Sequence, residues 1–454
     1  MPTPVRLGLI GCGVVGSGLL RLLGERSRDI ECAVGAPLRV TRVAVADLKK
    51  PRSVDLGGAS LGADPMAVAN AEDVDLLVEL MGGAEKSLAP VERALTRGLP
   101  VVTANKHLIS VHGGRLEVLA AANGAALRYE ASVGGVIPIL QSLDHGLRTE
   151  RFQLLVGILN GTTNFILSTM EREGRDFAEA LEAARKLGFA EADPSLDLSG
   201  ADTAQKLTIL VRRAFRVPVE HGSIPTEGIV GMEQEDLRQA DRFGYVVRLL
   251  GIAMRTAAGL DLRVHPAFIP KRYLLAAVRD EFNGVYLRGE AAGSMMLYGK
   301  GAGALATAQA VLGDVMASAR ELIWKKAAAA PRAASAGAPR DSGVGTPSSG
   351  AAPERAGAGD ASLTRLSLDD VRTKYYIRLQ VEDRPGVLAQ IAARLGSSSV
   401  SVAQMFQEPG VRGQAAITML THEARDKDAR EAIRAIAELP TIRKAPRAVR
   451  IFDI

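Results

Sequence analysis

The sequence has little of what several protein classes depend on. Its two cysteines, Cys12 and Cys32, are too few for a disulfide scaffold and lack the spacing of a zinc site. Aromatic residues are only 4% of the chain and do not interleave with a basic stripe, which argues against nucleic-acid binding. No apolar run is long enough to cross a membrane, and residues 5–10 already predict a buried strand rather than a signal peptide. A cytoplasmic protein is therefore expected.

The residues that are present predict a globular protein of several domains. A length of 454 residues suggests two to four domains. Apolar residues at 47% and charged residues at 24% are typical of globular domains. The 56 Lys and Arg residues are interspersed with 51 Asp and Glu residues, so the net charge of +5 forms no basic stripe.

A glycine-rich turn near the start predicts a dinucleotide site. The strand at residues 5–10 runs directly into Gly11-Cys-Gly-Val-Val-Gly16, and a helical leucine pattern follows. In this order Gly11 permits a tight turn, Gly13 lets the backbone approach a pyrophosphate, and Gly16 lets helix and strand pack closely. The alternative is a turn that only serves packing. The predicted cofactor contacts are Gly11, Gly13, Val14, Val15 and Gly16.

The end of the second predicted strand, residues 40–46, bears on the choice of cofactor. Asp47 is placed to accept the ribose hydroxyls of NAD, whereas Lys49 and Lys50 suit the 2′-phosphate of NADP. NADP is favoured, and NAD remains open.

Two further strand ends carry candidate ligands. Lys106 follows the predicted strand 100–103 at its carboxyl end, where it can reach a cofactor or a substrate anion, unless it is a solvent-exposed loop lysine. Glu130 ends another strand and precedes the glycine-containing turn 131–138, whose carbonyls together with a carboxylate can hold a hard cation. The alternative for this turn is a tight connection between domains.

The stretch 188–206 concentrates the chemistry. It brings together Glu191, Asp197, Asp202 and Lys206 in a loop that leads into a helix. Ser199 and Asp202 have the spacing of a capping box. Lys206 lies one turn beyond Asp202, beside an apolar stripe, so its ammonium can sit in a partly dry cleft and act on a carbonyl. The alternative is an ordinary solvent-facing helix pair.

The rest of the chain predicts two more folded parts. Residues 152–158 form a strand that leads into a small polar turn containing Gly161 and Thr162. A helix around 236–251, short strands near 252–254, 260–264 and 284–287, and an alanine-rich helix at 304–325 follow. From 327 to about 360 the chain has almost no large apolar side chain and predicts a flexible linker. Beyond residue 375 the order βαββαβ predicts a ferredoxin-like module.

Several of these stretches resemble homoserine dehydrogenase of the form with a C-terminal ACT domain. The resemblance rests on motifs in the family's order between residues 5 and 325, and on the turn at Asp383–Leu388, which is similar to that of ACT modules. The matching stretches are 11–16, 103–106, 130–135, 157–164, 188–193, 197–206 and 226–228.

The resemblance implies a fold and an activity. The expected fold is an α/β Rossmann domain at 1–130 with 304–326 packing back on it, an α+β catalytic domain at 131–303, a linker at 327–372 and an ACT domain at 373–454. The expected reaction is the NAD(P)-dependent interconversion of L-homoserine and L-aspartate 4-semialdehyde. Another amino-acid dehydrogenase on this scaffold, and a non-catalytic dinucleotide and amino-acid sensor, are the alternatives.

The resemblance also assigns roles to residues. Lys206 is the acid/base at the aldehyde oxygen, Lys106 lies between nicotinamide and substrate, and Asp202 orients the lysine or the reacting oxygen. Substrate binding falls to Glu191, Asp197, Gly161 and Thr162, with the two carboxylates holding the ammonium group. A monovalent cation, usually sodium, is held by Glu130 and the carbonyls of Val133, Gly135 and Ile137.

The resemblance implies partners as well. The ACT domain is expected to sense threonine and to pair across a homodimer or homotetramer interface, unless it only aids assembly. We expect a chain ending near Lys326 to stay active and to lose any threonine response.

Overall fold

The computed structural model describes residues 2–52, 54–329, 363–410 and 413–453. These residues fall into two compact units, Met1–Gly146 with Ala302–Gly359, and Leu147–Gly301 with Asp360–Ile454. None of the helices within the described ranges has the length and apolarity to cross a bilayer.

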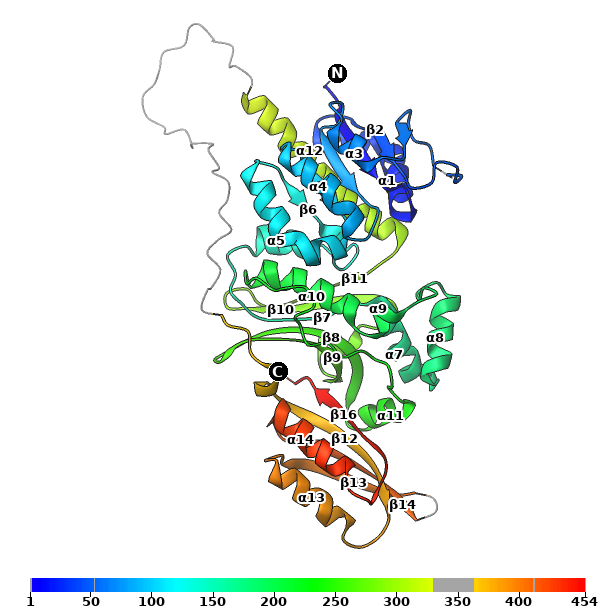
Figure 1. Cartoon of the computed structure of the whole chain (residues 1–454), viewed down its shortest axis with the longest axis vertical. Helices are drawn as coiled ribbons and strands as arrows, with labels where there is room; N and C mark the ends of the chain where they lie inside the picture. Colours follow the sequence, from blue (N-terminus) through cyan, green and yellow to red (C-terminus); the bar gives the residue numbers. More distant parts are fainter. Residues whose placement is uncertain (1, 53, 330–362, 411–412, 454) are drawn as a thin grey trace, which may run out of the picture. The chain divides into compact units, whose positions relative to one another are not determined.

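The first unit is built on a six-stranded parallel sheet in the order β3-β2-β1-β4-β5-β6. This order reverses direction at β1, as in doubly wound dinucleotide-binding folds. The predicted Rossmann domain is therefore confirmed (Figure 1). The strands are β1 (Val5–Ile10), β2 (Leu38–Ala44), β3 (Ser60–Gly62), β4 (Leu76–Glu79), β5 (Val101–Thr103) and β6 (Leu127–Arg128).

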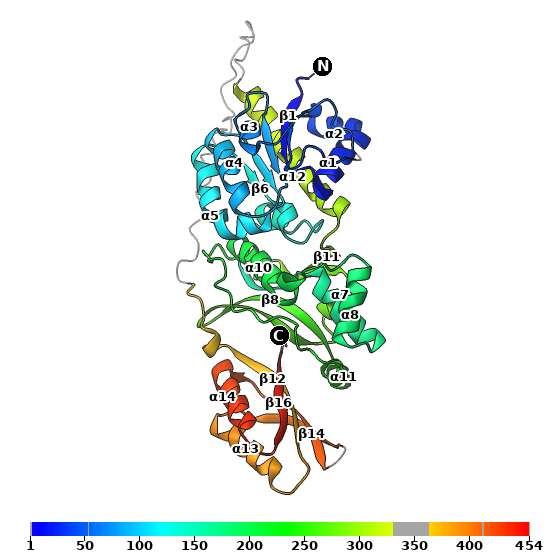
Figure 2. The same cartoon turned by 45° about the vertical axis from the view of Figure 1, so that its right-hand side comes forward.

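Helices cover both faces of this sheet (Figure 2). One layer contains α3 (Pro65–Asn70), α4 (Glu85–Thr96) and α5 (Lys106–Ala122), and the other contains α1 (Val14–Glu25), α2 (Ser27–Val34) and α12 (Ala304–Ala329). The alanine-rich α12 lies close to α1, because a Cβ added at Gly18 would be only 3.0 Å from the Cβ of Ala308. Small side chains at this crossing allow the close approach.

The first unit extends further along the chain than the expected boundary at residue 130. Residues 131–146 contain η1 (Glu130–Ser132), α6 (Ile139–Gln141) and η2 (Ser142–Gly146). They are held there because the Glu130 N–H donates to Asp314 of α12, and the Glu130 carboxylate accepts from the N–H groups of Leu140 and Gln141.

The second unit contains the predicted α+β part. Its antiparallel strands run in the order β11-β10-β7-β8-β9. They are β7 (Phe152–Ile158), β8 (Tyr245–Thr256), β9 (Gly259–Pro270), β10 (Phe282–Gly289) and β11 (Gly293–Lys300), with η3 (Leu274–Ala277). The helices are α7 (Gly161–Glu173), α8 (Phe177–Lys186), α9 (Ser195–Leu198), α10 (Ala201–Ala214) and α11 (Gln234–Arg242).

One predicted helix of this part, around residues 236–251, is wrong over its second half. The helix α11 ends at Arg242, and the strand β8 begins at Tyr245. Gly244, at φ +79°, turns the chain between them. The apolar run that follows Gly244 resembles a helical stripe, but its valines favour a strand.

The C-terminal module has the predicted βαββαβ order. It consists of β12 (Arg372–Glu382), α13 (Val387–Ser397), β13 (Val402–Pro409), β14 (Gln414–Thr421), β15 (Ala424–Arg425), α14 (Asp426–Ala437) and β16 (Ile442–Ile451). The helices α13 and α14 pack on one face of its sheet (Figure 1). Its last strand pairs in parallel with β9, through Arg450 opposite Ala267 and Ile451 opposite Phe268, so the two parts share one sheet.

Most of the expected linker, 330–362, lies outside the described residues. Its two ends are structured, which differs from the expectation. Residues 327–329 complete α12, and Leu260 of β9 exchanges backbone hydrogen bonds with Thr364 and Leu366 before η4 (Leu368–Asp370) begins.

Candidate active site

The glycine turn after β1 has the geometry expected for each of its glycines. Gly11 is at φ +95°, and a Cβ there would lie 2.6 Å from the backbone of Leu80. A Cβ at Gly16 would lie 2.4 Å from the Gly11 carbonyl oxygen. No heavy atom outside the turn comes within 4 Å of a Cβ position at Gly13, and the first turn of α1 carries no acidic residue. The turn therefore leaves room, without a repelling charge, for a phosphate at the helix N-terminus.

The loop after β2 places the residues that bear on the cofactor's ribose. Asp47 accepts a 2.8 Å hydrogen bond from the N–H of Lys49 through Oδ1, and its carbonyl accepts one from Arg52. Asp47, Lys49 and Lys50 are all exposed. One Asp47 oxygen is thus used to shape the turn, while both lysines stay exposed on it.

A buried carboxylate that the sequence analysis missed organises the loop before Lys106. Glu79, fully buried at the end of β4, accepts hydrogen bonds from the hydroxyls of Ser87 at 2.9 Å and Thr103 at 2.6 Å. Asn105 caps α5 and donates to the Ser87 hydroxyl. This network fixes the backbone from which the half-buried Lys106 projects at the first position of α5.

Two buried carboxylates lie together near the predicted cation site. Both oxygens of Glu130 accept backbone N–H groups, from Leu140 at 2.9 Å and Gln141 at 2.6 Å. Burial nevertheless raises the pKa of Glu130 to about 7, and the carboxylates of Asp314 and Asp144 add to the shift. Burial likewise raises the pKa of Asp314 to about 6. Asp314 is a second residue that sequence reasoning missed.

The backbone of the predicted cation site makes two tight turns. Gly134 and Gly135 are at φ +72° and +60°. The Ile137 carbonyl accepts a hydrogen bond from Ile139 at 2.8 Å, and an oxygen has a second lone pair for a cation.

In the second unit, Asp197, Asp202 and Lys206, three of the predicted site residues, are linked through Asn160 into one chain of contacts. The Lys206 ammonium lies 2.8 Å from Asp202 Oδ2 and donates to the Leu159 carbonyl at 2.6 Å. Asn160 donates to that same Asp202 oxygen at 2.8 Å and to Asp197 Oδ1 at 2.7 Å. The side chains of Lys206 and Asp202 are only 11% and 3% exposed, which excludes the solvent-facing pair.

The capping role predicted for Ser199 and Asp202 is wrong. The N-cap of α10 is Gly200, in a left-handed conformation with no side-chain cap, and the Ser199 hydroxyl donates to the Leu196 carbonyl. Asp202 is instead held by Asn160 and Lys206. Buried ionic partners outweigh a local cap for this carboxylate, because an unpaired buried charge costs several kcal/mol.

The remaining predicted substrate residues differ in how they are placed. A Cβ at Gly161 would lie 2.7 Å from the Glu281 carbonyl oxygen, so this position needs a glycine. The Thr162 hydroxyl donates to the Phe189 carbonyl at 2.6 Å and so anchors the loop before Glu191. Glu191 itself is exposed in that loop, whereas the Asn160 side chain binds Asp197 and Asp202.

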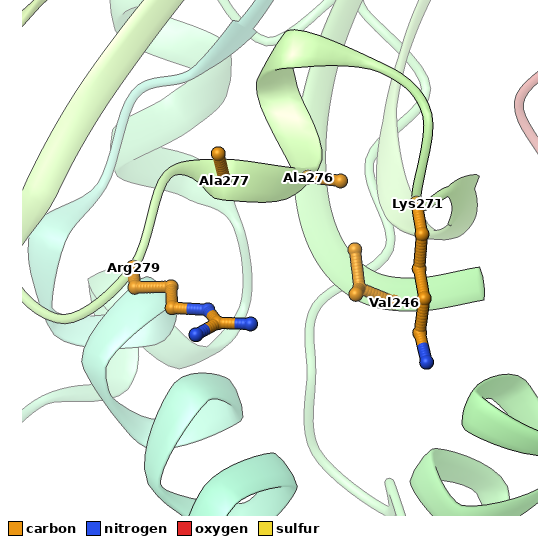
Figure 3. Close-up of a pocket in the computed structure, with 5 residues that line it drawn as sticks. All are labelled: Val246, Lys271, Ala276, Ala277 and Arg279. Atoms are coloured by element: carbon orange, nitrogen blue, oxygen red, sulfur yellow. The ribbon is translucent and has the colours of Figure 1, made fainter. Parts of the chain in front are cut away.

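Another hollow in this unit contains none of these residues. It has a volume of about 330 Å³ and is lined by Val246, Lys271, Ala276, Ala277 and Arg279 (Figure 3). Its two cations are engaged by carboxylates, Lys271 by Asp241 and Arg279 by Glu171.

Known proteins match nearly the whole length of the chain. Residues 11–130 match the family model described as "Homoserine dehydrogenase, NAD binding domain", residues 138–316 match "Homoserine dehydrogenase" and residues 375–441 match "ACT domain". The homoserine dehydrogenase of Neisseria gonorrhoeae is 36% identical over 453 residues, which is 99% of each chain.

Solved structures agree. That of a homoserine dehydrogenase from Thiobacillus denitrificans has 38% identity and a TM-score of 0.88 over 99% of both chains. A hyperthermophilic archaeal homoserine dehydrogenase mutant in complex with NADPH has 25% identity and a TM-score of 0.60, covering 70% of this chain and 98% of that one. Full-length similarity of this kind decides against the two alternative functions left open by the sequence.

The three matching regions, the dinucleotide-binding sheet and the buried lysine–carboxylate cluster therefore agree on one family. The chain belongs to the homoserine dehydrogenases, oxidoreductases that interconvert L-homoserine and L-aspartate 4-semialdehyde with a nicotinamide cofactor, and it carries a C-terminal ACT domain.

Proposed function

We propose that Lys206 is the acid and base of this reaction, with Asp202 as its positioning partner. The observation that carries the proposal is the buried ammonium itself. Two of its three N–H donors are directed to Asp202 and to the Leu159 carbonyl, which leaves one for the substrate oxygen.

The bound nicotinamide supplies or accepts the hydride. In the reducing direction Lys206 donates a proton to the forming alkoxide, and in the oxidising direction it accepts the hydroxyl proton. Asp197 and Glu191 select the substrate by its ammonium group, with Gly161 and Thr162 shaping the same subsite. Lys106 acts between nicotinamide and substrate.

Replacing Lys206 by Met tests this role, because Met retains the length of the stem and removes the charge. Turnover is expected to fall by roughly 10²–10⁴-fold, the range of a positioned acid or base, with the KM for the cofactor nearly unchanged. Lys186→Met is the matched control, since Lys186 also pairs with a carboxylate one turn earlier, Glu182, but is 75% exposed. A folded Lys206→Met protein with near-normal turnover would remove the assignment.

A preference for NADP over NAD is the second part of the proposal. The ammonium groups of Lys49 and Lys50 are exposed on the loop that follows β2, where a 2′-phosphate is expected, and one oxygen of Asp47 is already used within the turn. The archaeal relative that binds NADPH supports this choice. Changing both lysines to Ala should raise the KM for NADP more than the KM for NAD. Equal increases for the two cofactors would contradict the preference.

The third part is a monovalent cation, sodium, held by Glu130 and the carbonyls of Val133, Gly135 and Ile137. The residues fit such an ion because Glu130 and Asp314 are buried carboxylates whose pKa values are raised by burial, and a bound cation would favour their charged forms. Thermal stability and activity should both be higher in sodium chloride than in choline chloride at equal ionic strength. Glu130→Gln should abolish that difference, and a difference that persists would exclude this site.

The last part concerns regulation and assembly. Threonine is proposed as the effector of the ACT domain, and a homodimer or homotetramer as the assembled form. Millimolar threonine should lower the turnover of the full-length enzyme, and light scattering should give a mass of two or four chains. An enzyme that ignores millimolar threonine would exclude threonine as the effector.

A further inference from the structure

A short segment far from the catalytic helix in sequence supports the turn between Asp197 and Asp202. A Cβ at Gly228 would lie 2.0 Å from the Leu198 carbonyl oxygen, so the two backbones are in direct contact. The N–H of Ile229 donates to that same carbonyl at 2.9 Å. A Cβ at Gly200 would lie 3.0 Å from the Thr226 methyl group. A displacement of residues 226–229 would therefore displace the turn at residues 198–200.

The same segment is held by the ACT domain. The ACT domain reaches it through Arg450 of β16, one of whose guanidinium nitrogens lies 2.7 Å from the Glu227 carboxylate, while the Glu227 N–H donates to the Val264 carbonyl of β9 in the catalytic part at 2.8 Å. The other face of that guanidinium binds Asp426, at the start of α14, through Nε at 2.8 Å and Nη2 at 2.6 Å. Tyr375 also donates to Asp426, at 2.6 Å. One guanidinium thus joins a carboxylate of the catalytic part to a carboxylate of the ACT domain.

We infer that Arg450 is a positioning residue that couples the ACT domain to the substrate-binding turn through Glu227. This inference rests on the substrate-binding role proposed above for Asp197. Arg450 touches neither substrate nor cofactor. It acts by fixing the position of the Thr226–Ile229 segment, which is in backbone contact with the turn before α10.

The physical properties of this side chain suit the role. The Arg450 side chain is 7% exposed, and its guanidinium is a rigid plane. If Asp426 moves and the guanidinium moves with it, the distance from the guanidinium to Glu227 changes. The contacts between this segment and the turn are made at Gly228 and Gly200. These residues have no side chain that could change rotamer, so a movement of one backbone displaces the other. A change in the position of α14 or β16 would reach Asp197 first, and so would change substrate affinity before it changed the hydride step.

The test is Glu227→Gln in the full-length enzyme, compared with Glu233→Gln. The two glutamates are alike, because each pairs with an arginine of an ACT strand, Glu233 with Arg378 at 2.9 Å, and each is partly exposed, at 55% and 38%. The contacts of Glu233 lead to α11 instead of to the catalytic turn. We expect Glu227→Gln to raise the KM for homoserine about 3- to 10-fold, well below the roughly 100-fold loss that a 1 Å misplacement can cause. The KM for the cofactor should stay as in the wild type. Glu233→Gln should lower the melting temperature, because Glu233 also caps α11 and pairs with Lys444, but should leave both KM values unchanged.

A second measurement separates this inference from the catalytic assignments. Amide exchange at Ile229 should be faster in Glu227→Gln, because its hydrogen bond to Leu198 loosens, and this readout does not depend on turnover. Arg450→Lys keeps one charge but not the fork, and should reproduce the KM effect in part. An unchanged KM for homoserine in Glu227→Gln overturns the inference, as does an equal effect of Glu233→Gln. If Lys206→Met leaves turnover intact while Glu227→Gln still loosens Ile229 and raises the KM, the coupling stands and the role of Lys206 falls.

Discussion

Asn160 holds together two of the carboxylates beside Lys206. Its amide donates to Asp197 and Asp202, and its carbonyl oxygen accepts the N–H of Thr163 as the N-cap of α7. One residue thus holds two carboxylates of like charge side by side and begins a helix. Because the amide is neutral, it does so without competing with Lys206 for the negative charge.

Asn160→Ser separates these two tasks. Serine caps a helix about as well as asparagine, so the cap is kept, and the loss of stability should be the roughly 1–3 kcal/mol of a buried carboxylate that loses a hydrogen bond. Its short hydroxyl cannot reach both carboxylates, and kcat/KM for homoserine should fall at least about 10-fold. Asp176→Ser, at the exposed N-cap of α8, is the control and should leave the kinetics unchanged. An Asn160→Ser enzyme with wild-type kinetics would show that the bridge is not needed.

At this scale the sequence predicted part of the site. The four-residue spacing of Asp202 and Lys206 correctly placed them on one helix face beside a core, because helical geometry is local. The capping role was wrong because the competing partner, Asn160, is 42 residues away. Glu79 and Asp314 were missed because each lies in an apolar stretch. A lone carboxylate in such a stretch is the signal that could have found them.

The strand β9 shows why whole elements are harder to predict. All twelve of its residues are buried, including Asp261, Arg263 and His265, which alternate along one face. Charged residues at every second position usually indicate a solvent-exposed face, so the sequence predicted only a short strand at 260–264. The structure buries that face against the ACT domain, where Arg263 pairs with Asp261 at 3.2 Å.

The buried His265 should make stability depend on pH. Burial lowers its pKa well below the ordinary value of 6.5, and the nearby charges of Arg450 and Arg263 add to this shift. The folded chain therefore keeps His265 neutral, while the unfolded chain takes up a proton below about pH 6.5. The contribution of His265 to the free energy of unfolding is therefore complete above that pH. It is lost as the pH falls, by at most about 1.4 kcal/mol per pH unit. Urea unfolding at pH 7.5 and 5.5 should show a smaller loss for His265→Gln than for the wild type. Equal losses would mean that His265 is protonated in the folded protein.

For the second unit as a whole, the ACT domain is bound to the catalytic part by more than a linker. Beyond the pairing of β16 with β9, Arg378 of β12 binds Asp236 at 3.0 Å and Glu233 at 2.9 Å. The rings of Phe268 and Tyr376 stack at 4.6 Å. The sequence predicted both folds but not the sheet that they share. The strands β9 and β16 each also pair within their own part, so nothing in their sequences indicates that they pair with each other.

This joining changes the outcome expected for a chain that ends at Lys326. The sequence suggested an active enzyme that has only lost its sensor. In the structure, that deletion exposes one edge of β9 and the Phe268 ring, and removes Arg378 from Asp236. An open strand edge favours aggregation, and the newly exposed apolar surface costs stability. The truncated chain should therefore melt on the order of 10 °C lower than the full-length enzyme and lose activity on standing. Arg378→Met in the full-length chain should give a similar drop in melting temperature without exposing the edge, so light scattering distinguishes the two effects. A truncated chain with the full-length melting temperature and kinetics would show that the shared sheet adds nothing to the stability of the catalytic part.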